Sequence, residues 1–387
     1  MPTLMSPPNH IMWQSERNQP VVARVAIAGD FLPAGKLSLP PNANWRDMAR
    51  PLDPHFEDVA LAFANLECAI NAEGLPPRVL CGIGEIVGAH EAALDYLDSI
   101  QTRIIGLANN HAYDFGAAGV ERTRAAIHHR KMNAIGAGRH LKSAPDVYLW
   151  QGPESVRVGF WSAAKATHDP ATRARAGVEP ATIERAQGAC NAMSVQGASF
   201  RIALLHVGCL RTNRPDPEDV RLMDSIARCG FDIVAASHSH RISGYREIAE
   251  SHGRPSFCFY GLGSLISGYA ACALEREGLI IVAGLTVAGD LARVEVRPVL
   301  LQDNGFGSVP DQRSSETILD RFRNLSTEIT DASFIRRFYE DVSRGLARLY
   351  LRDVRTAYGQ AGVRGLARKA SRLRLRHFRR LVHGMVG

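Results

Sequence analysis

The sequence predicts a layered α/β fold, and three observations lead to this prediction. Several short runs of β-branched and small apolar residues each end in a polar residue, as the buried strands of a parallel sheet do. Segments with apolar residues at helical spacing lie between these runs, in the alternating order of α/β folds. The chain has 387 residues, 45% of them hydrophobic, and this is enough to bury one large core or two ordinary ones.

The first third of the chain contains three predicted strands. Residues 21–30 (VVARVAIAGD) are an apolar run, and Gly29 would let the backbone turn there or approach a ligand closely. Residues 58–70 form the second run, after a Pro-rich loop. Residues 88–100 have apolar side chains near helical spacing, which predicts a covering helix before the strand at 103–107.

The middle of the chain is less regular. Residues 119–138 predict a helix that closes on Gly136, and residues 146–164 predict a β-hairpin. Residues 165–199 are rich in Ala, Arg and Gly and weakly periodic, so we interpret them as a variable insertion and a candidate substrate-side lid. A helix over 180–190 is expected inside this insertion.

The second half returns to a clear alternation of strands and helices. The expected elements, in order, are a strand at 200–210, a helix at 219–230, a strand at 231–245, a strand with a Gly-rich turn at 254–268, a hairpin at 277–305 and a helix at 314–329.

Composition restricts the predicted location of the protein and the kinds of partner it could bind. No signal peptide and no run of 18 apolar residues is evident, which predicts a cytoplasmic protein with at most a peripheral membrane contact. Seven scattered cysteines without a CxxC pair predict reduced core thiols. The net charge is +7, but eight of the 46 basic residues and none of the 39 acidic ones follow residue 360, so the body is nearly neutral.

Polar side chains follow the predicted strands one after another. They are Asp30, Asn65, Glu67, Asn110, His111, His206, His238 and His240, with Asp114 three residues after His111. Parallel strands place their carboxyl ends at one edge of a sheet, so these distant residues are expected to converge. His238 and His240, at i and i+2 of an extended chain, would point to the same side.

Such a cluster is what a metal ion needs. Carboxylate oxygens and imidazole nitrogens suit Mn, Fe or Zn, and the absence of a cysteine cluster argues against structural zinc or an iron–sulfur centre. An acid at the end of an apolar strand, such as Glu67, is costly unless it is paired or bound to metal. We therefore expect one or two divalent ions here, with Mg and Ca also open.

The ordered motifs of this chain resemble the CapA-type (PGA_cap) branch of the calcineurin-like metallophosphoesterase superfamily, whose founding members serve poly-γ-glutamate capsule synthesis. The resemblance runs from about residue 21 to residue 329. It is carried by AGD (28–30), ANLE (64–67), ANNHAYDFGAAGV (108–120), LLHVG (204–208), SHSHRISGYREI (237–248) and FYGLGSL (259–265). The resemblance implies a four-layer α-β-β-α sandwich of two mixed sheets, with a mono- or dinuclear centre at the strand ends.

The resemblance also implies a role for each site residue. Asp30 and His240 would bind a first metal, Glu67 would lie between two metals, and Asn110, His206 and His238 would bind a second. His111, oriented by Asp114, would be the general acid or charge stabiliser. Asn65, Arg211 and Arg241, which neighbour these residues, are the candidate substrate-binding residues.

Two departures from the superfamily pattern affect the expected chemistry. Asp30 is followed by Phe31 and Leu32 where the wider superfamily has Asp-x-His, so the first metal lacks one imidazole and a single metal is as plausible as two. Cys209, Leu210 and Arg211 stand where the family usually has aromatic and acidic residues, which puts the family's substrate in question.

Three functions stay open from the sequence. The first is a metal-dependent hydrolase of a phosphoester or amide, acting on a small molecule, a peptide or polyglutamate. The second is a cytosolic metal-dependent peptide epimerase, in which a site imidazole moves an acidified α-proton. The third is a polymer-binding scaffold without catalysis.

The expected domain organisation is a leader at 1–20, the domain that carries the resemblance at 21–330, and a basic helical extension at 331–387. Residues 361–387 alternate Arg with apolar residues. Packing on the body, an anionic membrane surface and an acidic partner are the open interpretations of this tail. No module that reads nucleic-acid sequence is visible.

Overall fold

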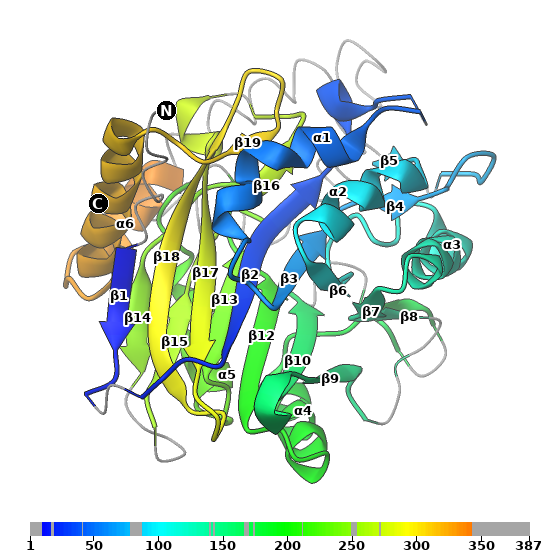
Figure 1. The fold of residues 1–387 in the computed structure, drawn as a ribbon. Coiled ribbons are helices and arrows are strands. Elements are labelled where there is room, and N and C mark those ends of the chain that lie inside the picture. The colour runs from blue at the N-terminus through cyan, green and yellow to red at the C-terminus, as the bar shows by residue number, and fades with distance from the viewer. Residues whose placement is uncertain are drawn as a thin grey trace, which may run out of the picture.

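The structure is a computed structural model, and it describes residues 10–16, 19–40, 42–77, 87–138, 141, 144–165, 170–172, 175–210, 212–248, 254–270 and 272–342. Two large sheets lie one behind the other (Figure 1). Arg211 and the basic tail at 361–387 fall outside the described residues, so the predictions made for them stay predictions.

The first sheet has nine strands. Seven follow the order β1 (His10–Gln14), β18 (Leu291–Leu301), β17 (Glu277–Leu285), β2 (Ala23–Leu32), β3 (Leu61–Leu66), β6 (Thr102–Gly106) and β7 (Asn133–Ile135). The other two are β16 (Ser264–Ser267), which pairs with β2, and β19 (Gly307–Ser308), which pairs with β18. The strands β2, β3, β6 and β7 are parallel, so their carboxyl ends share one edge.

The second sheet has six strands. Their order is β14 (Tyr245–Ile248), β15 (Ser256–Phe259), β13 (Ile233–Ser237), β12 (Phe200–His206), β10 (Arg157–Ala164) and β9 (Val147–Gln151). The four central strands are parallel, and β9 and β10 form the predicted hairpin. Two short pairs complete the sheets: β4 (Ala69–Ile70) with β5 (Gly88–Ala89), and β8 (Ala137–Gly138) with β11 (Gly177–Val178).

Three apolar clusters separate four layers. The middle cluster joins the facing sides of the two sheets, and it includes an edge-to-face pair of Phe63 and Phe160 with ring centroids 5.4 Å apart. The outer clusters join each sheet to its helices. The helices on the first sheet are α1 (Trp45–Ala49), α2 (Leu94–Ser99) and α3 (Gly116–His129), and those on the second are α4 (Ile183–Val195) and α5 (Pro217–Ala227). The predicted α-β-β-α sandwich is confirmed.

Several short helical turns and one long helix complete the described fold. The 3-10 turns are η1 (Gly35–Leu37), η2 (Arg50–His55), η3 (Glu91–Ala93), η4 (Pro153–Ser155) and η5 (Ala273–Glu275). Helix α6 (Gln312–Ile329) covers the open side of the middle cluster with Ile318, Phe322 and Leu325. Residues 334–342 form a further helix after α6. No helix of the described ranges combines the length and apolar character needed to cross a membrane.

The helix predicted over 119–138 is shorter than expected. Helix α3 ends at His129, and Lys131 adopts a positive φ of 57°, which breaks the helical path. Residues 133–135 then join the first sheet as β7, parallel to β6. The apolar residues near Gly136 therefore belong to a strand, and their spacing misled the prediction because three residues cannot reveal a period.

The helix expected within segment 165–199 is α4, which connects the parallel strands β10 and β12. Its N-terminus is capped by Thr182, whose hydroxyl accepts a hydrogen bond from the Arg185 backbone NH. Ala186, Ala189 and Met193 of α4 are buried against the second sheet. This part of the segment is thus a crossover helix of the sheet, and the lid role of the segment stays a prediction.

Gly29 is required by a contact between strands. A Cβ on Gly29 would lie 2.1 Å from the carbonyl oxygen of Gly263, and the same carbonyl accepts a hydrogen bond from the Asp30 backbone NH at 3.1 Å. Gly29 therefore permits close approach of backbone to backbone, next to the candidate site, rather than the approach to a ligand that its sequence position suggested.

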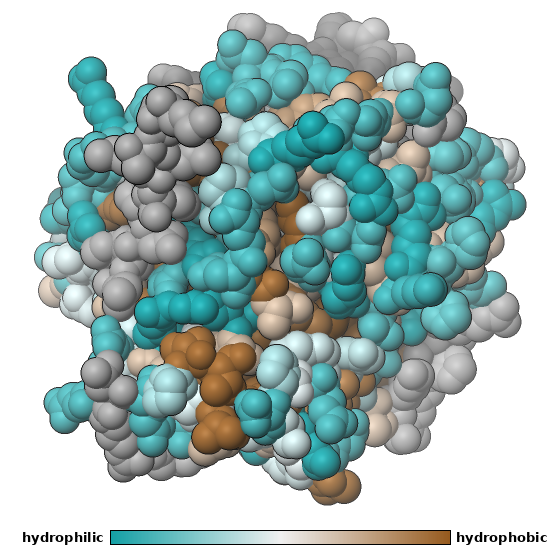
Figure 2. All heavy atoms as spheres, viewed as in Figure 1, coloured by the Kyte–Doolittle hydropathy of each residue, from teal (hydrophilic) through white to brown (hydrophobic). Residues whose placement is uncertain are grey.

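A buried ion-pair network lies on the helix-facing side of β18. Arg297 is fully buried and pairs with Glu295 and Asp58, and its Nη1 also donates to the backbone carbonyl of His55. Arg24 and Arg293 extend the network through ion pairs with Asp58 and Glu295. The face of the molecule seen in Figure 2 is mainly hydrophilic, with smaller hydrophobic areas. His55 is also fully buried, and its Nε2 donates to the carbonyl of Pro298 at 2.8 Å.

Acid is expected to destabilise the protein through His55. Burial, with help from the Arg297 charge, lowers the pKa of His55 from 6.5 to about 4. The unfolded chain therefore takes up this proton near pH 6.5 and the folded chain only near pH 4, so stability is full above pH 7 and falls as the pH drops. The loss should reach about 3 kcal/mol, measured by urea unfolding. A His55→Gln variant should show a flatter profile; equal slopes for the two proteins between pH 7 and 4.5 would refute this role.

Candidate metal centre

Two carboxylates come from neighbouring strands of the first sheet. Asp30 lies near the end of β2 and Glu67 directly follows β3, which runs parallel to β2. Both side chains are almost completely buried. The parallel strands predicted from the sequence thus bring these two acids together.

Three imidazoles come from the second sheet. His206 is the last residue of β12, and His238 and His240 follow β13. Backbone φ angles of 104° at His238 and 55° at His240 show that this segment is a tight turn. The prediction that the pair shares one side of an extended chain is therefore wrong, although both rings still reach the same cluster.

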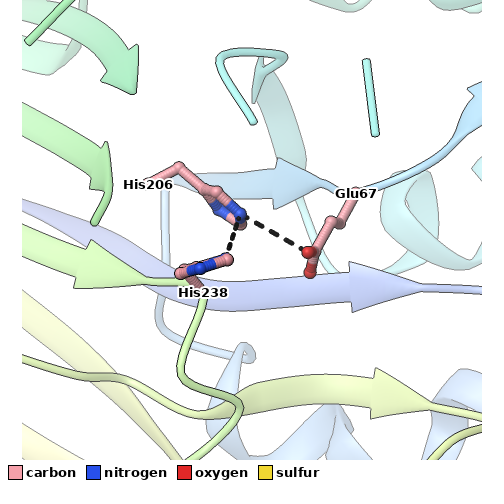
Figure 3. A group of neighbouring side chains, drawn as sticks. All are labelled: Glu67, His206 and His238. Atoms are coloured by element: carbon pink, nitrogen blue, oxygen red, sulfur yellow. Dashed lines mark hydrogen bonds and ion pairs between the residues drawn. The ribbon is translucent and has the colours of Figure 1, made fainter. Parts of the chain in front are cut away.

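The five side chains form two overlapping donor groups. The first is Glu67, His206 and His238, and the second is Asp30, Glu67 and His240; within each group the ligand atoms lie within 4.8 Å of one another. Figure 3 shows that a ring nitrogen of His206 contacts both other members of the first group. Its Nε2 lies 2.9 Å from His238 Nδ1 and 3.4 Å from Glu67 Oε1.

The second group has similarly short distances. His240 Nδ1 lies 3.2 Å from Asp30 Oδ2 and 3.8 Å from Glu67 Oε2. Glu67 is the one residue common to both groups, as expected for a carboxylate placed between two metal positions. Asn110 also joins the cluster, since its Oδ1 lies 2.5 Å from His206 Nε2.

These residues fit a divalent metal. The buried Oε2 of Glu67 has no hydrogen-bond partner among the described residues, and an oxygen buried in this way is costly unless a cation meets it. Mixed carboxylate and imidazole donors without thiolate suit Mn, Fe or Zn. The expected ligand set of Asp30, Glu67, Asn110, His206, His238 and His240 is thus brought together around a small volume.

The pKa values of the cluster reflect burial first and the neighbouring charges second. Burial, reinforced by the Asp30 carboxylate, raises the pKa of Glu67 to about 8, and burial lowers the pKa of His206 to about 3. For Asp30 and His240 burial is outweighed by their mutual contact and by neighbouring charges, which lowers the pKa of Asp30 to about 2 and raises that of His240 to about 9. A bound cation would take the place of the protons held here.

His111 and Asp114 lie beside this cluster as an oriented pair. His111 Nδ1 is 2.8 Å from Asp114 Oδ2, and the same oxygen accepts from the Val87 backbone NH. Burial would lower the pKa of His111, but the hydrogen bond that its ring donates to Asp114 and the charge of Glu67 outweigh this effect and raise the pKa. With Nδ1 directed at Asp114, Nε2 is the atom that can exchange a proton with a substrate.

Asn65 lies deeper in the protein than the predicted substrate-binding role would place it. It was a candidate substrate contact, but it is almost fully buried and its Nδ2 donates to Asp30 Oδ1 at 2.7 Å. Its Oδ1 accepts from Asn109 Nδ2, and Asn109 Oδ1 in turn accepts from the His111 backbone NH. The geometry therefore gives Asn65 and Asn109 a positioning role that connects the metal cluster to His111.

The sequence prediction did not include three of these supporting residues. Besides Asn109, Ser237 Oγ lies 3.1 Å from His206 Nδ1 and Ser264 Oγ lies 3.2 Å from His240 Nδ1. All three stand within a few residues of a strand end, as the ligands do. Their position near strand ends is the one feature of the sequence that could have identified them, but small polar residues at strand ends are too common to be singled out without coordinates.

Replacing Asn65 with alanine is expected to weaken metal binding by about 10- to 100-fold, because Asp30 loses the amide that holds its carboxylate. Titration calorimetry with Mn²⁺ measures this. Asn133→Ala, which removes a partly buried amide on the edge strand β7, is the matched control and should bind Mn²⁺ as the unchanged protein does. Equal affinities for all three proteins would show that Asn65 does not position the ligand.

Arg241 directly follows the ligand His240, and it lies outside the metal cluster. Its Nη2 pairs with Glu275 Oε1 at 3.3 Å, and its side chain lines a separate cavity.

The free cysteines among the described residues are Cys68, Cys190, Cys209, Cys229, Cys258 and Cys272. Cys68, Cys190, Cys209 and Cys258 are buried, as predicted for core thiols, whereas Cys229 is half-buried and Cys272 is exposed.

The chain is similar to several solved structures that are named as nucleotidases and as a calcineurin-like phosphoesterase. They include the Haemophilus influenzae NAD nucleotidase (TM-score 0.44, 11% identity, 78% of this chain and 56% of that one) and the calcineurin-like phosphoesterase YfkN of Bacillus subtilis (TM-score 0.44, 12% identity, 80% and 99%). A 5'-nucleotidase precursor of Thermus thermophilus gives a TM-score of 0.47 at 12% identity, over 80% of this chain and 60% of that one.

Sequence relatives carry names from polymer synthesis. A Mycobacterium tuberculosis protein named "Probable polyglutamine synthesis accessory protein" is 26% identical over 317 residues, which is 76% of this chain and 79% of the relative. The "Capsule biosynthesis protein CapA" of Bacillus anthracis is 25% identical over 169 residues, 42% of this chain and 39% of the relative.

The family model described as "Bacterial capsule synthesis protein PGA_cap" matches residues 24–269. This range includes all six residues of the expected ligand set, together with His111 and Asp114. The chain therefore belongs to the PGA_cap family of bacterial capsule synthesis proteins, as its motifs predicted.

Proposed function

We propose that this protein is a metal-dependent hydrolase that cleaves a phosphoester or an amide in the metabolism of a capsule or polyglutamate polymer. The observation that carries the proposal is the pair of buried donor groups sharing Glu67, with an oriented histidine beside them. The names of the relatives, which refer to polyglutamine and capsule synthesis, support the polymer context.

The ligand residues would hold the metal in the following way. Glu67, His206 and His238, with Asn110, offer one position, and Asp30, Glu67 and His240 offer the other. A divalent metal supplies Lewis-acid activation of water and of a substrate oxygen. Asn65 and Asn109 keep the carboxylate of Asp30 and the backbone of His111 in a fixed relation.

His111 would supply the proton chemistry. Asp114 accepts the Nδ1 hydrogen of His111 and stabilises the protonated ring, whose pKa is already raised. The Nε2 proton is then available for the oxygen or nitrogen that leaves when the substrate bond breaks. Positioned acid catalysis of this kind contributes about 10²- to 10⁴-fold in rate.

The direct test is Mn²⁺-dependent turnover of two chromogenic substrates, an aryl phosphate and a γ-glutamyl anilide, in H₂O and in D₂O. The proposal predicts cleavage of one of them, lost on chelation and restored by Mn²⁺. Incorporation of deuterium from D₂O at the α-carbon of the uncleaved γ-glutamyl anilide would contradict hydrolysis and identify an epimerase. Metal binding without either reaction would contradict catalysis and favour the polymer-binding scaffold.

A further inference from the structure

Two helices near the C-terminus contact the segments that carry the three imidazoles of the metal centre. The family model ends at residue 269, and both α6 and the helix at 334–342 come after it. One ligand-bearing segment is the His206 loop, which we define as residues 207–210 and 212–216, between β12 and α5. The other is the histidine turn, residues 238–244, between β13 and β14.

Helix α6 packs directly on the end of the histidine turn. A Cβ on Gly244 would lie 2.3 Å from the backbone nitrogen of Ser326, so a larger residue than glycine would push the helix away. Ser326 Oγ also accepts a hydrogen bond from the Tyr245 backbone NH at 3.0 Å. Backbone contact and hydrogen bond together fix the turn relative to α6.

The helix at 334–342 contacts the His206 loop through apolar side chains. Phe338 and Val342 are buried in a small cluster with Cys209, which lies three residues after the ligand His206. This cluster is separate from the three large ones described above. Phe334, one turn earlier, is buried in the cluster between the second sheet and its helices. The helix is therefore anchored on the body by Phe334 and on the loop by Phe338.

Arg214 of the His206 loop joins both helices. Its Nη2 lies 2.8 Å from Glu328 Oε2, near the end of α6, and its Nη1 pairs with Asp341 of the helix at 334–342. Arg337 of the same helix also approaches Glu328, at 3.6 Å. One guanidinium group thus ties the loop to two helices, and Asp341 is the part of this connection that the last helix supplies.

The His206 loop is in turn bonded to the histidine turn. Asn213 Nδ2 donates to the Ile242 carbonyl at 2.9 Å, and the Asn213 carbonyl accepts from Ser243 Oγ at 2.7 Å. The turn needs such support, because His238 and His240 hold positive φ angles that residues other than glycine adopt only when their surroundings enforce them. Contacts that hold the loop therefore also hold the two imidazoles of the turn.

We propose that the helix at 334–342 positions the imidazoles of the metal centre, by holding the His206 loop through Phe338 and Asp341. The inference rests on the metal centre of the proposed function and deepens it, because it makes this helix a part of the same site. If the helix no longer held the loop, the strained histidine turn could relax. Metal binding would then have to restore the turn, and the affinity for metal would fall.

The experiment compares Asp341→Asn and Phe338→Ala with the unchanged full-length protein. Hydrogen–deuterium exchange without metal should be faster in the peptide that covers residues 206–214, because the loop has lost a contact. Titration calorimetry should show Mn²⁺ binding weakened by about three- to tenfold. Asp341 is half-buried, so Asp341→Asn keeps the test valid if Phe338→Ala fails to fold, and thermal melts check the fold of each variant.

The matched control is Asp95→Asn. Asp95 is exposed to a similar extent and pairs with Arg130, which binds two acids as Arg214 does, but this network joins η3, α2 and the end of α3. The control should lose a similar ion pair while exchange in residues 206–214 and Mn²⁺ affinity stay as in the unchanged protein. Arg214→Gln combined with Asp341→Asn should bind Mn²⁺ no more weakly than Arg214→Gln alone, because both changes break one connection.

Two results would overturn the inference. Unchanged exchange in residues 206–214 of both helix variants would show that the helix does not hold the loop. Faster exchange with the Mn²⁺ affinity of Asp95→Asn would show that the loop does not position the ligands. Cleavage of a chromogenic substrate in either case would leave the proposed hydrolase standing. Mn²⁺ binding that depends on the helix as expected, in a protein that cleaves neither substrate, would refute the hydrolase and support the inference.

Discussion

Glu67→Gln is expected to reduce metal affinity by at least about 100-fold and hydrolysis by on the order of 10³-fold. Glu67 belongs to both donor groups, so this single change removes a charged ligand from each. The amide is nearly isosteric with the carboxylate, which keeps packing intact. Calorimetry with Mn²⁺ and turnover of the cleaved chromogenic substrate measure the two effects.

The same substitution should have the opposite effect on the stability of the metal-free protein. Burial and the charge of Asp30 raise the pKa of Glu67, so its ionised form is unfavourable when no cation is bound. Above pH 8, metal-free Glu67→Gln should therefore melt at a higher temperature than the metal-free unchanged protein. Sites that sacrifice stability for function show this trade-off.

Glu179→Gln is a suitable control for Glu67→Gln. Glu179 is also buried, but it pairs with Arg185 at 2.5 Å on the helix side of the second sheet. Glu179→Gln should lower the melting temperature, because Arg185 loses its charged partner, and it should leave Mn²⁺ affinity unchanged. If Glu67→Gln binds Mn²⁺ as tightly as Glu179→Gln does, Glu67 is not a shared ligand.

His111→Asn is expected to lower kcat by about 10²- to 10⁴-fold while Mn²⁺ affinity changes little. The residue hydrogen-bonds to Asp114 and to no member of the two donor groups in the described contacts. Asp114→Asn should give a smaller loss, because the imidazole remains but its orientation and its protonated form are less favoured.

The size of the loss should depend on the leaving group. A substrate with an acidic nitrophenolate leaving group needs little help from an acid, so His111→Asn should affect it least, and an alkyl ester should be affected most. Full activity of His111→Asn on the alkyl ester would rule out the acid role. A parallel loss of Mn²⁺ affinity would instead make His111 a metal-supporting residue.

The convergence of the site could be predicted because it depends on strand direction alone. Asp30, Glu67 and His206 each stand at the end of an apolar run, and parallel strands bring such ends together whatever the loops do. The two-sheet architecture itself came from the resemblance, since alternation of strands and helices does not reveal how many sheets form. The hydrophobic runs therefore predict where the site lies, and the resemblance to the family predicts the four layers of the fold.

Details that depend on turns could not be predicted. His238 and His240 adopt positive φ angles because of how their loop packs in the folded protein. A glycine would have indicated such angles, but the sequence has none at these positions. Gly29 does indicate a close approach, but the sequence does not say which atom approaches it, and the structure gives the carbonyl of Gly263, 234 positions along the chain. The sequence places Asn65 next to the site but does not show that its amide donates to Asp30, which only the coordinates reveal.

The cavity that Arg241 lines could not be predicted for a similar reason. Arg241 stood out by its place after His240, but Arg214 and Arg321 come from a loop and from α6, and nothing in their local sequence indicates a common surface. Helix α6 packs on the second sheet, where the ring of Phe322 stacks on the rings of Phe259 and Tyr245. This packing, and not a motif, brings the three arginines together.

The central claim is that one buried centre holds a metal between the two sheets, with Glu67 shared by its donors. Anomalous diffraction from a crystal grown with Mn²⁺ tests it most directly. We expect an anomalous peak at about 2.0–2.3 Å from Glu67 and from His206 or His240, since first-row metals bind oxygen and nitrogen donors at about these distances. Crystals saturated with Mn²⁺ that show no peak beside Glu67, or show one only elsewhere, would contradict the account.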